Sequence, residues 1–268
     1  MPTVLVTGAS TGIGRATALA LAGTHTVLAG VRRIEDAPPG TTPVELDVTN
    51  AAHVAALRDI GELDALVNNA GIAVTSPLEH LPLDELRRQL EVNVVGQLAV
   101  TQAVFAQLRR ARGRVVNVSS IGGRMALPLY GPYAASKYAL EALSDSLRRE
   151  QREVKVIVIE PGAIATPIWD RGIATADSLW AGVPPEAHAR YGALVAGMRA
   201  QAAKMGTEGV PPEEAAALIV KALTTRRPRP RYLIGREAKV QAVIARVLPD
   251  RALDAVLAAG LRRLLNNR

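Results

Sequence analysis

The chain has 268 residues, of which 49% are hydrophobic and 21% charged, and its net charge is +7. This length fits one large α/β domain better than two small ones. Cysteine is absent and the four histidines are scattered, which excludes disulfides and thiol catalysis and predicts a protein without a metal site.

Six short apolar runs alternate with helix-length segments over residues 1–160. They are Val4–Thr7, Thr26–Val31, Pro43–Leu46, Ala65–Asn68, Arg114–Val118 and Val154–Glu160. Continuously apolar runs of this length indicate parallel strands that crossover helices bury on both faces. With a last strand at Arg231–Ile234, the sequence predicts an α/β fold: one Rossmann-like, doubly wound parallel sheet of about seven strands.

A glycine-rich turn, TGASTGIG at residues 7–14, follows the first predicted strand and opens a helix at Ala16–Ala22. Glycines at positions 8, 12 and 14 let an anion approach the backbone, where free N–H groups and the helix dipole favour negative charge. A structural turn would also use glycine. Its place between a strand and a helix favours binding of a dinucleotide pyrophosphate.

The end of the second strand selects between dinucleotides. An acidic residue there binds the ribose 2′-hydroxyl and repels a 2′-phosphate. Val31 stands in that place and is followed by Arg32 and Arg33, and a guanidinium binds phosphate well. NADP(H) is therefore favoured over NAD(H), unless both arginines are solvated loop charges.

The sequence YAASK places Tyr133 and Lys137 on one face of a helix, four residues apart. A free phenol has a pKa of ~10 and is a poor base at neutral pH. The Lys137 ammonium, with the positive charge of an oxidised nicotinamide, favours the phenolate, so we expect a lowered Tyr133 pKa. Neither Tyr130 nor Tyr138 has a lysine four residues on.

Residues 163–212 are rich in Ala, Gly and Pro, and no strand is predicted there. Three of the eight aromatic residues, Trp169, Trp180 and Tyr191, lie in this segment, whereas a disordered linker is poor in aromatics. We predict a substrate lid built from short helices. Its apolar residues favour an apolar, bulky substrate: Ile168, Trp169, Leu179, Trp180, Met198 and Met205.

The C-terminal part begins with a helix at Pro211-Pro212-Glu213-Glu214. Residues 237–267 carry Leu and Val at helical spacing, which predicts a packed helix pair. An amphipathic surface for a membrane is the less favoured alternative. The basic cluster at residues 226–231 is interpreted as a solvated turn and not as a nucleic-acid surface. Met1 leads directly into the first strand, so we expect no secretory signal and a cytoplasmic protein.

In this order and spacing, the glycine turn, VNVSS, YAASK and PGAIATP resemble the classical short-chain dehydrogenase/reductase family from Val4 to about Thr166. Residues 119–150 are similar to the hydroxysteroid and retinol dehydrogenase subgroup. The resemblance implies an NAD(P)-dependent oxidoreductase that interconverts an alcohol and a carbonyl, in a single domain (1–268) that forms a homodimer or homotetramer. It implies a catalytic set of Asn93, Ser120, Tyr133 and Lys137, with Asn93 on a long helix that follows the fourth strand.

The resemblance also implies which residues contact the cofactor. Three of these sites have a structural role as the alternative to cofactor binding. Asp47 could cap a helix at Ala51–Leu57. Asn-Ala-Gly at residues 69–71 and the segment ending at Thr166 could each be a simple turn. Thr11 is neutral where NADP-preferring relatives often have a basic residue, which leaves NAD(H) open. The full expected set is Gly8, Ser10, Thr11, Gly12, Ile13, Gly14, Arg32, Arg33, Asp47, Val48, Asn69, Ala70, Gly71, Tyr133, Lys137, Pro161, Gly162, Ile164 and Thr166.

A different class of function remains open at this point. The fold could belong to a catalytically silent, cofactor-binding regulatory or scaffold protein. The intact set of Asn93, Ser120, Tyr133 and Lys137 argues against it. Consumption of NAD(P)H with a panel of ketones separates the two.

Overall fold

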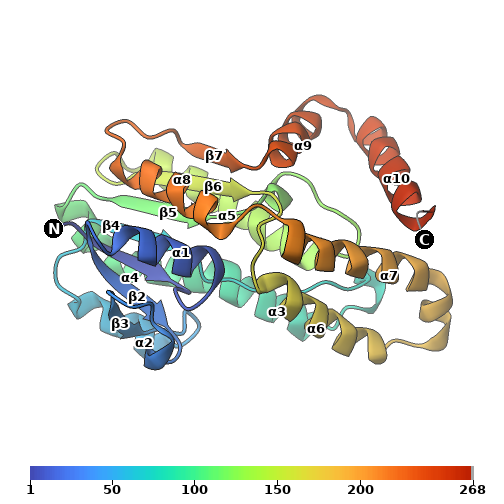
Figure 1. The fold of residues 1–268 in the computed structure, drawn as a ribbon, viewed down its shortest axis with the longest axis horizontal. Coiled ribbons are helices and arrows are strands. Elements are labelled where there is room, and N and C mark those ends of the chain that lie inside the picture. The colour runs from blue at the N-terminus through green and yellow to red at the C-terminus, as the bar shows by residue number, and fades with distance from the viewer. Residues whose placement is uncertain (267–268) are drawn as a thin grey trace.

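A seven-stranded parallel sheet forms the centre of the molecule, with strand order β3-β2-β1-β4-β5-β6-β7 (Figure 1). This computed structural model describes residues 1–266, and it confirms the predicted doubly wound sheet. The strands are β1 (Thr3–Thr7), β2 (Thr26–Val31), β3 (Thr42–Glu45), β4 (Ala65–Asn68), β5 (Arg114–Val118), β6 (Lys155–Pro161) and β7 (Arg231–Ile234). Four match the predicted bounds, β1 begins one residue earlier, and β3 and β6 are each shifted by one residue, β3 towards the N-terminus and β6 towards the C-terminus.

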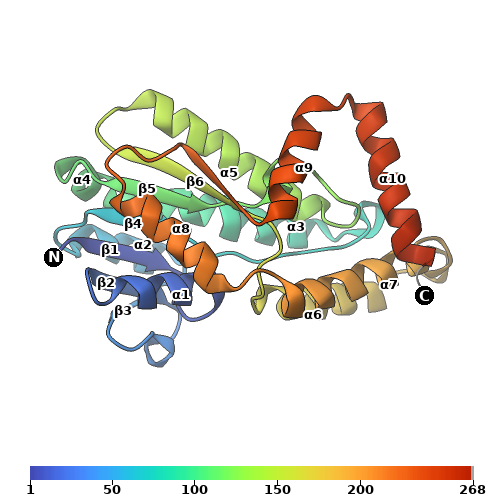
Figure 2. The same ribbon diagram turned by 45° about the horizontal axis from the view of Figure 1, so that its top comes forward.

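Alternation along the strands divides the core into two layers. Val4 and Val6 of β1 pack in one cluster with α1 (Gly12–Leu21) and α8 (Pro212–Thr224). Leu5, which points to the other face, packs with α4 (Gly96–Arg110). The same face carries α2 (Ala51–Ala56), α5 (Gly131–Glu150) and α3 (Leu83–Leu90), and Figure 2 shows α5 and α1 on opposite sides of the sheet.

Two helix boundaries differ from expectation in ways that matter for the site. α1 begins at Gly12, inside the glycine turn, and not at Ala16. The long helix predicted around Asn93 is interrupted, because a π-helical turn at Glu91–Val95 joins α3 to α4. Such turns are frequent at functional sites.

The segment 163–212 forms a helical hairpin. We predicted short helices, but α6 (Ile168–Ala181) has 14 residues and α7 (Pro185–Glu208) has 24. The hairpin leaves and rejoins the sheet at one point: Ala165 N donates to Val210 O (3.0 Å) and Val210 N to Ala163 O (3.0 Å). It projects from the sheet beyond the ends of the strands (Figure 1).

The C-terminal part forms the helix pair α9 (Arg236–Val247) and α10 (Asp250–Asn266). α9 contacts β7, and α10 returns to contact α7 (Figure 2). No helix among residues 1–266 has both the length and the apolar character that a membrane crossing requires. The last predicted positions, 267 and 268, lie outside the described residues.

Candidate active site

A cleft opens at the carboxyl ends of β1, β4, β5 and β6, where the strand order reverses between β1 and β4. Ligands of open α/β sheets bind at this position. The cleft brings together the residues expected at the site, with three exceptions among those described. The exceptions are Gly14, Arg33 and Asn93, which lie beside or behind it.

The glycine turn is held in shape by the segment that follows β4. Gly8 (φ +65°) and Gly12 (φ +56°) adopt the left-handed conformation that favours glycine. A Cβ on Gly14 would lie 2.3 Å from the Gly8 carbonyl oxygen, so Gly14 serves close packing. Asn69 Nδ2 donates to the Thr7 and Gly8 carbonyls (3.0 and 3.2 Å). These bonds fix the turn against the segment that follows β4.

The two arginines after β2 have different surroundings. Arg32 lines the cleft. Arg33 donates to both carboxylate oxygens of Asp36 (2.9 and 2.8 Å) and also lies 3.7 Å from Glu35. These bonds raise the pKa of Arg33. The structure therefore makes Arg32, and not Arg33, the guanidinium at the end of β2 that faces the cleft.

Asp47 lines the cleft and does not cap the following helix. Asn50 is the N-cap of α2, since its side chain accepts from the N–H groups of Ala52 and His53 (2.9 and 3.3 Å). Asp47 Oδ1 accepts instead from the amide and hydroxyl of Thr49 (2.9 and 2.7 Å). Although burial opposes ionisation, these bonds hold the Asp47 pKa below its ordinary value.

Tyr133, Lys137 and Ser120 converge at the inner end of the cleft. Lys137 Nζ lies 5.7 Å from the centroid of the Tyr133 ring and donates to the Val118 carbonyl (2.8 Å). Ser120 Oγ accepts from Gly122 N (3.0 Å), which fixes the hydroxyl at the end of β5. The three side chains expected to take part in proton transfer therefore line the same cleft.

The pKa of Tyr133 is shifted in the direction opposite to our expectation. Burial raises it, and a hydrogen bond with Ser120 only partly opposes this. Burial also lowers the Lys137 pKa to about 8, against the attraction of Glu141. Because burial penalises every charged form, the side chains of the protein alone keep the phenol protonated near neutral pH.

Asn93 does not line the cleft but braces it from behind. It is fully buried and exchanges hydrogen bonds with the backbone of Ile72 (2.9 and 3.0 Å). Its Nδ2 also donates to Ser136 Oγ (3.1 Å), beside Lys137. Gln89, one helical turn earlier, was not among the predicted site residues. It donates to the same Ile72 carbonyl (2.9 Å) and accepts from Val74 N (2.6 Å). The signal was a polar residue four positions before Asn93.

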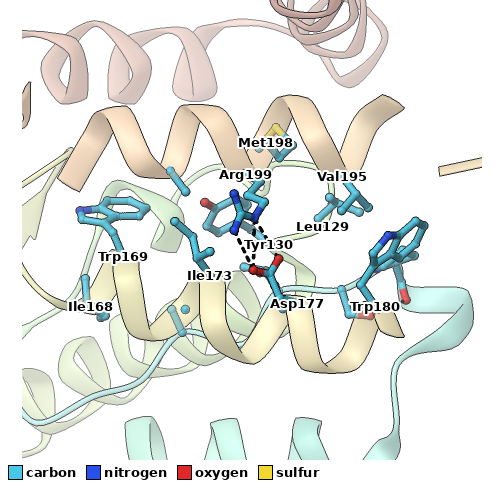
Figure 3. Close-up of a pocket in the computed structure, with 17 residues that line it drawn as sticks. Leu129, Tyr130, Ile168, Trp169, Ile173, Asp177, Trp180, Val195, Met198 and Arg199 are labelled. Carbon is cyan, nitrogen blue, oxygen red and sulfur yellow. Dashed lines mark hydrogen bonds and ion pairs between the residues drawn. The ribbon is translucent and has the colours of Figure 1, made fainter. Parts of the chain in front are cut away.

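An apolar side pocket adjoins the cleft, between the α6–α7 hairpin and the segments after β4 and β5 (Figure 3). Of the apolar residues predicted to face the substrate, Ile168, Trp169, Trp180 and Met198 line it. Leu179 and Met205 are not among its lining residues in the described chain. Trp169 lines both pocket and cleft, so the two cavities adjoin at α6.

Tyr130 lines the side pocket and lies next to Tyr133. Its ring packs edge-on against Tyr133, with centroids 6.5 Å apart, and burial raises its pKa to about 12. Across the same pocket, Arg199 of α7 pairs with Asp177 of α6 (2.9 Å), as the dashed lines in Figure 3 show. The pocket is thus apolar with an ion pair on one wall.

A family model for short chain dehydrogenases matches residues 2–176. An NADPH-dependent 3-dehydrocapnine reductase of Ornithobacterium rhinotracheale is 33% identical, with 97% of each chain covered. Retinol dehydrogenase 5 of Mus musculus is 37% identical over 95% of this chain and 87% of its own. A short chain dehydrogenase of Burkholderia cenocepacia, solved with NADP, superposes with a TM-score of 0.75 at 29% identity, covering 96% of this chain and 97% of the other. These findings confirm the resemblance: the chain belongs to the short-chain dehydrogenase/reductase family of oxidoreductases.

Proposed function

We propose that this protein interconverts an alcohol and a ketone or aldehyde on an apolar small molecule, with NADP(H) preferred over NAD(H). The observation that carries the proposal is the convergence of Tyr133, Lys137 and Ser120 in the cleft that the glycine turn opens. Asn93 acts with them as a buried brace. The nicotinamide, when bound, supplies or accepts the hydride.

The residues present fit a dinucleotide. Gly8 and Gly12 leave the backbone of the turn open to a phosphate, and α1 begins at that point with free N–H groups. Arg32 stands where a 2′-phosphate is expected, and Val31 supplies no acid to repel it. Two similar proteins favour the same choice, since one is described as NADPH-dependent and the other was solved with NADP.

The proton chemistry follows from the pKa directions. Because burial raises the Tyr133 pKa, the phenol holds its proton near neutral pH and can donate it to a carbonyl oxygen. Ser120 donates a hydrogen bond to the same oxygen and polarises it. The pKa of Lys137 is lowered to about 8, so its side chain is still mostly protonated at neutral pH. This positive charge favours the phenolate that Tyr133 becomes when it has donated its proton.

The side pocket supports an apolar substrate. A carbonyl placed between Ser120 and Tyr133 directs its substituent past Tyr130 towards Trp169 and Met198. We propose that the α6–α7 hairpin is the lid over this substituent. One similar protein is named retinol dehydrogenase 5, and this name supports a bulky apolar substrate.

The assay follows NADPH absorbance with a panel of ketones and aldehydes of increasing apolar size. We expect turnover that rises with apolar size and disappears in Tyr133→Phe. Tight NADPH binding without turnover on any member would favour a catalytically silent protein instead.

Assembly and location complete the proposal. We expect a homodimer or homotetramer in the cytoplasm, by resemblance to the family, with no nucleic-acid partner. On α9, Val240, Val243 and Val247 are exposed at helical spacing, and this stripe would suit a second copy or, as the less favoured alternative, lipid. Light scattering of the full chain and co-sedimentation with anionic liposomes measure the two.

A further inference from the structure

Arg171, on the first turn of α6, reaches the glycine turn 160 residues away in sequence. Its Nη2 donates to Thr11 Oγ1 (2.7 Å) and its Nε to the Pro167 carbonyl (3.2 Å). The side chain lines the cofactor cleft. A guanidinium has five N–H donors, so most of them remain for a ligand in the cleft.

The charge at this end of the cleft suits a strong anion. The first N–H groups of α1 are free of intrahelical partners, and the dipole of a helix places roughly half a positive charge at its N-terminus. The pyrophosphate of a dinucleotide is a dianion, so the helix end alone leaves most of its charge uncompensated. Arg171 adds a full positive charge at the residue that precedes α1.

We propose that Arg171 is a pyrophosphate ligand that ties α6 to the bound cofactor. The inference rests on the cofactor site proposed above and adds a residue to it from the opposite wall. The bond to Thr11 joins exposed groups, and such a bond contributes little to stability. The bond to Thr11 therefore orients the guanidinium in the cleft, and a phosphate oxygen can replace it at little cost in free energy.

The same contact links the cofactor to the substrate pocket. Gly172 follows Arg171 and packs on the segment after β4, because a Cβ there would lie 3.4 Å from the Ala73 carbonyl oxygen. Trp169, Gly172 and Ile173 all line the side pocket. A phosphate that holds Arg171 thus also fixes the wall that the substrate contacts.

Calorimetric titration with cofactor fragments tests the assignment. NAD⁺ and ADP-ribose contain the pyrophosphate, adenosine 2′-monophosphate contains only the 2′-phosphate, and NADP⁺ contains both. Arg171→Met should weaken NADP⁺, NAD⁺ and ADP-ribose by the same factor, about 10- to 100-fold for one charged hydrogen bond. It should leave adenosine 2′-monophosphate unchanged. Arg32→Met should give the complementary pattern and weaken only the ligands with a 2′-phosphate.

Two variants serve as controls. Lys204→Met removes one exposed cation of α7 that pairs with Glu208 and should leave every Kd unchanged. Thr11→Ser keeps a hydroxyl at this position and the guanidinium of Arg171, so it should leave the affinities for all four ligands nearly unchanged. A change below about twofold in Arg171→Met, or an equal loss of adenosine 2′-monophosphate, would overturn the inference. Failure of the unmodified protein to bind any dinucleotide would overturn the proposed function instead.

Tryptophan emission reports the link to α6. The two tryptophans of the chain, Trp169 and Trp180, both lie on α6. Saturating ADP-ribose should shift their emission in the unmodified protein and in Lys204→Met, but not in Arg171→Met. An equal shift in Arg171→Met at saturation would show that the cofactor orders α6 without this residue.

Discussion

A largely buried charge cluster lies beside α5, the helix that carries Tyr133 and Lys137, and loss of its central guanidinium should destabilise the fold. Arg231 of β7 donates to Glu141 (3.1 Å) and to Asp145 (2.8 Å) of α5 and lies 3.2 Å from Glu160 of β6. Glu160 is fully buried and also binds Arg124 (2.7 Å). Arg231→Met would leave Glu141 without its guanidinium in a buried position.

The magnitude follows from burial. Breaking a buried pair by removing one partner costs about 3–5 kcal/mol. The Arg231 side chain is 27% exposed and Glu160 keeps Arg124, so we expect about 2–4 kcal/mol near pH 8. Exposed Arg229, two residues earlier, provides the control: Arg229→Met should change stability by less than about 0.5 kcal/mol.

The loss should shrink at low pH. Burial raises the pKa of Glu141, and Glu160 raises it further, against hydrogen bonds from Ser119 and Arg231. A carboxyl with a raised folded pKa stabilises the fold below its unfolded pKa, and this contribution disappears as pH rises through the folded value. Removal of Arg231 raises that pKa again, so Glu141 takes up a proton more readily as the pH falls, and the protonated carboxyl has less need of a guanidinium.

Urea unfolding at about pH 5 and about pH 8 measures both effects through the midpoint. Glu141→Gln in the Arg231→Met background should recover part of the loss at pH 8, because it removes the unpaired charge. The reasoning is refuted by a loss below about 1 kcal/mol at pH 8, or by equal losses at the two pH values.

Three further predictions concern catalysis and cofactor choice. Tyr133→Phe should lower kcat by about 10²–10⁴-fold with the Kd for NADPH unchanged, whereas exposed Tyr138→Phe should behave as the unmodified enzyme in the same assay. Lys137→Met should lower kcat and also weaken cofactor binding; an unchanged Kd by fluorescence titration would remove its second role. Arg32→Ala with Val31→Asp should reverse the preference towards NADH, by adding a ribose partner and repelling a 2′-phosphate. If the unmodified protein binds NADH as well as NADPH, the NADP assignment fails while the oxidoreductase function stands.

Most strands could be predicted because a buried strand appears in the sequence as a short, continuously apolar run. β2, β4 and β5 have the predicted bounds, since short apolar runs have few alternatives in central strands that helices cover on both faces. The edge strand β7 also has its predicted bounds. The edge strand β3 was displaced by one residue, and three of its four residues are exposed. Where a strand is open to solvent, the apolar pattern that sets its ends is weak.

Residues defined by distant contacts were not predictable. Arg171 meets Thr11 only in the folded chain, and nothing near it in sequence marks it. The Arg33–Asp36 pair was visible in principle, because residues three apart commonly interact near helical turns. The Tyr133 pKa is raised because burial, which the sequence does not reveal, outweighs the hydrogen bond with Ser120.

The single point at which the α6–α7 hairpin joins the sheet has a consequence for how this chain can change. Ile164 and Val210 are paired, so the two ends of the intervening segment are already adjacent. Insertions and exchanges succeed where the ends of a segment lie close together, since loop closure then costs little entropy. The hairpin can therefore be exchanged as a unit. A hairpin from another member of the family, inserted between Ile164 and Val210, should replace one wall of the side pocket and leave the glycine turn, Tyr133 and Lys137 in place.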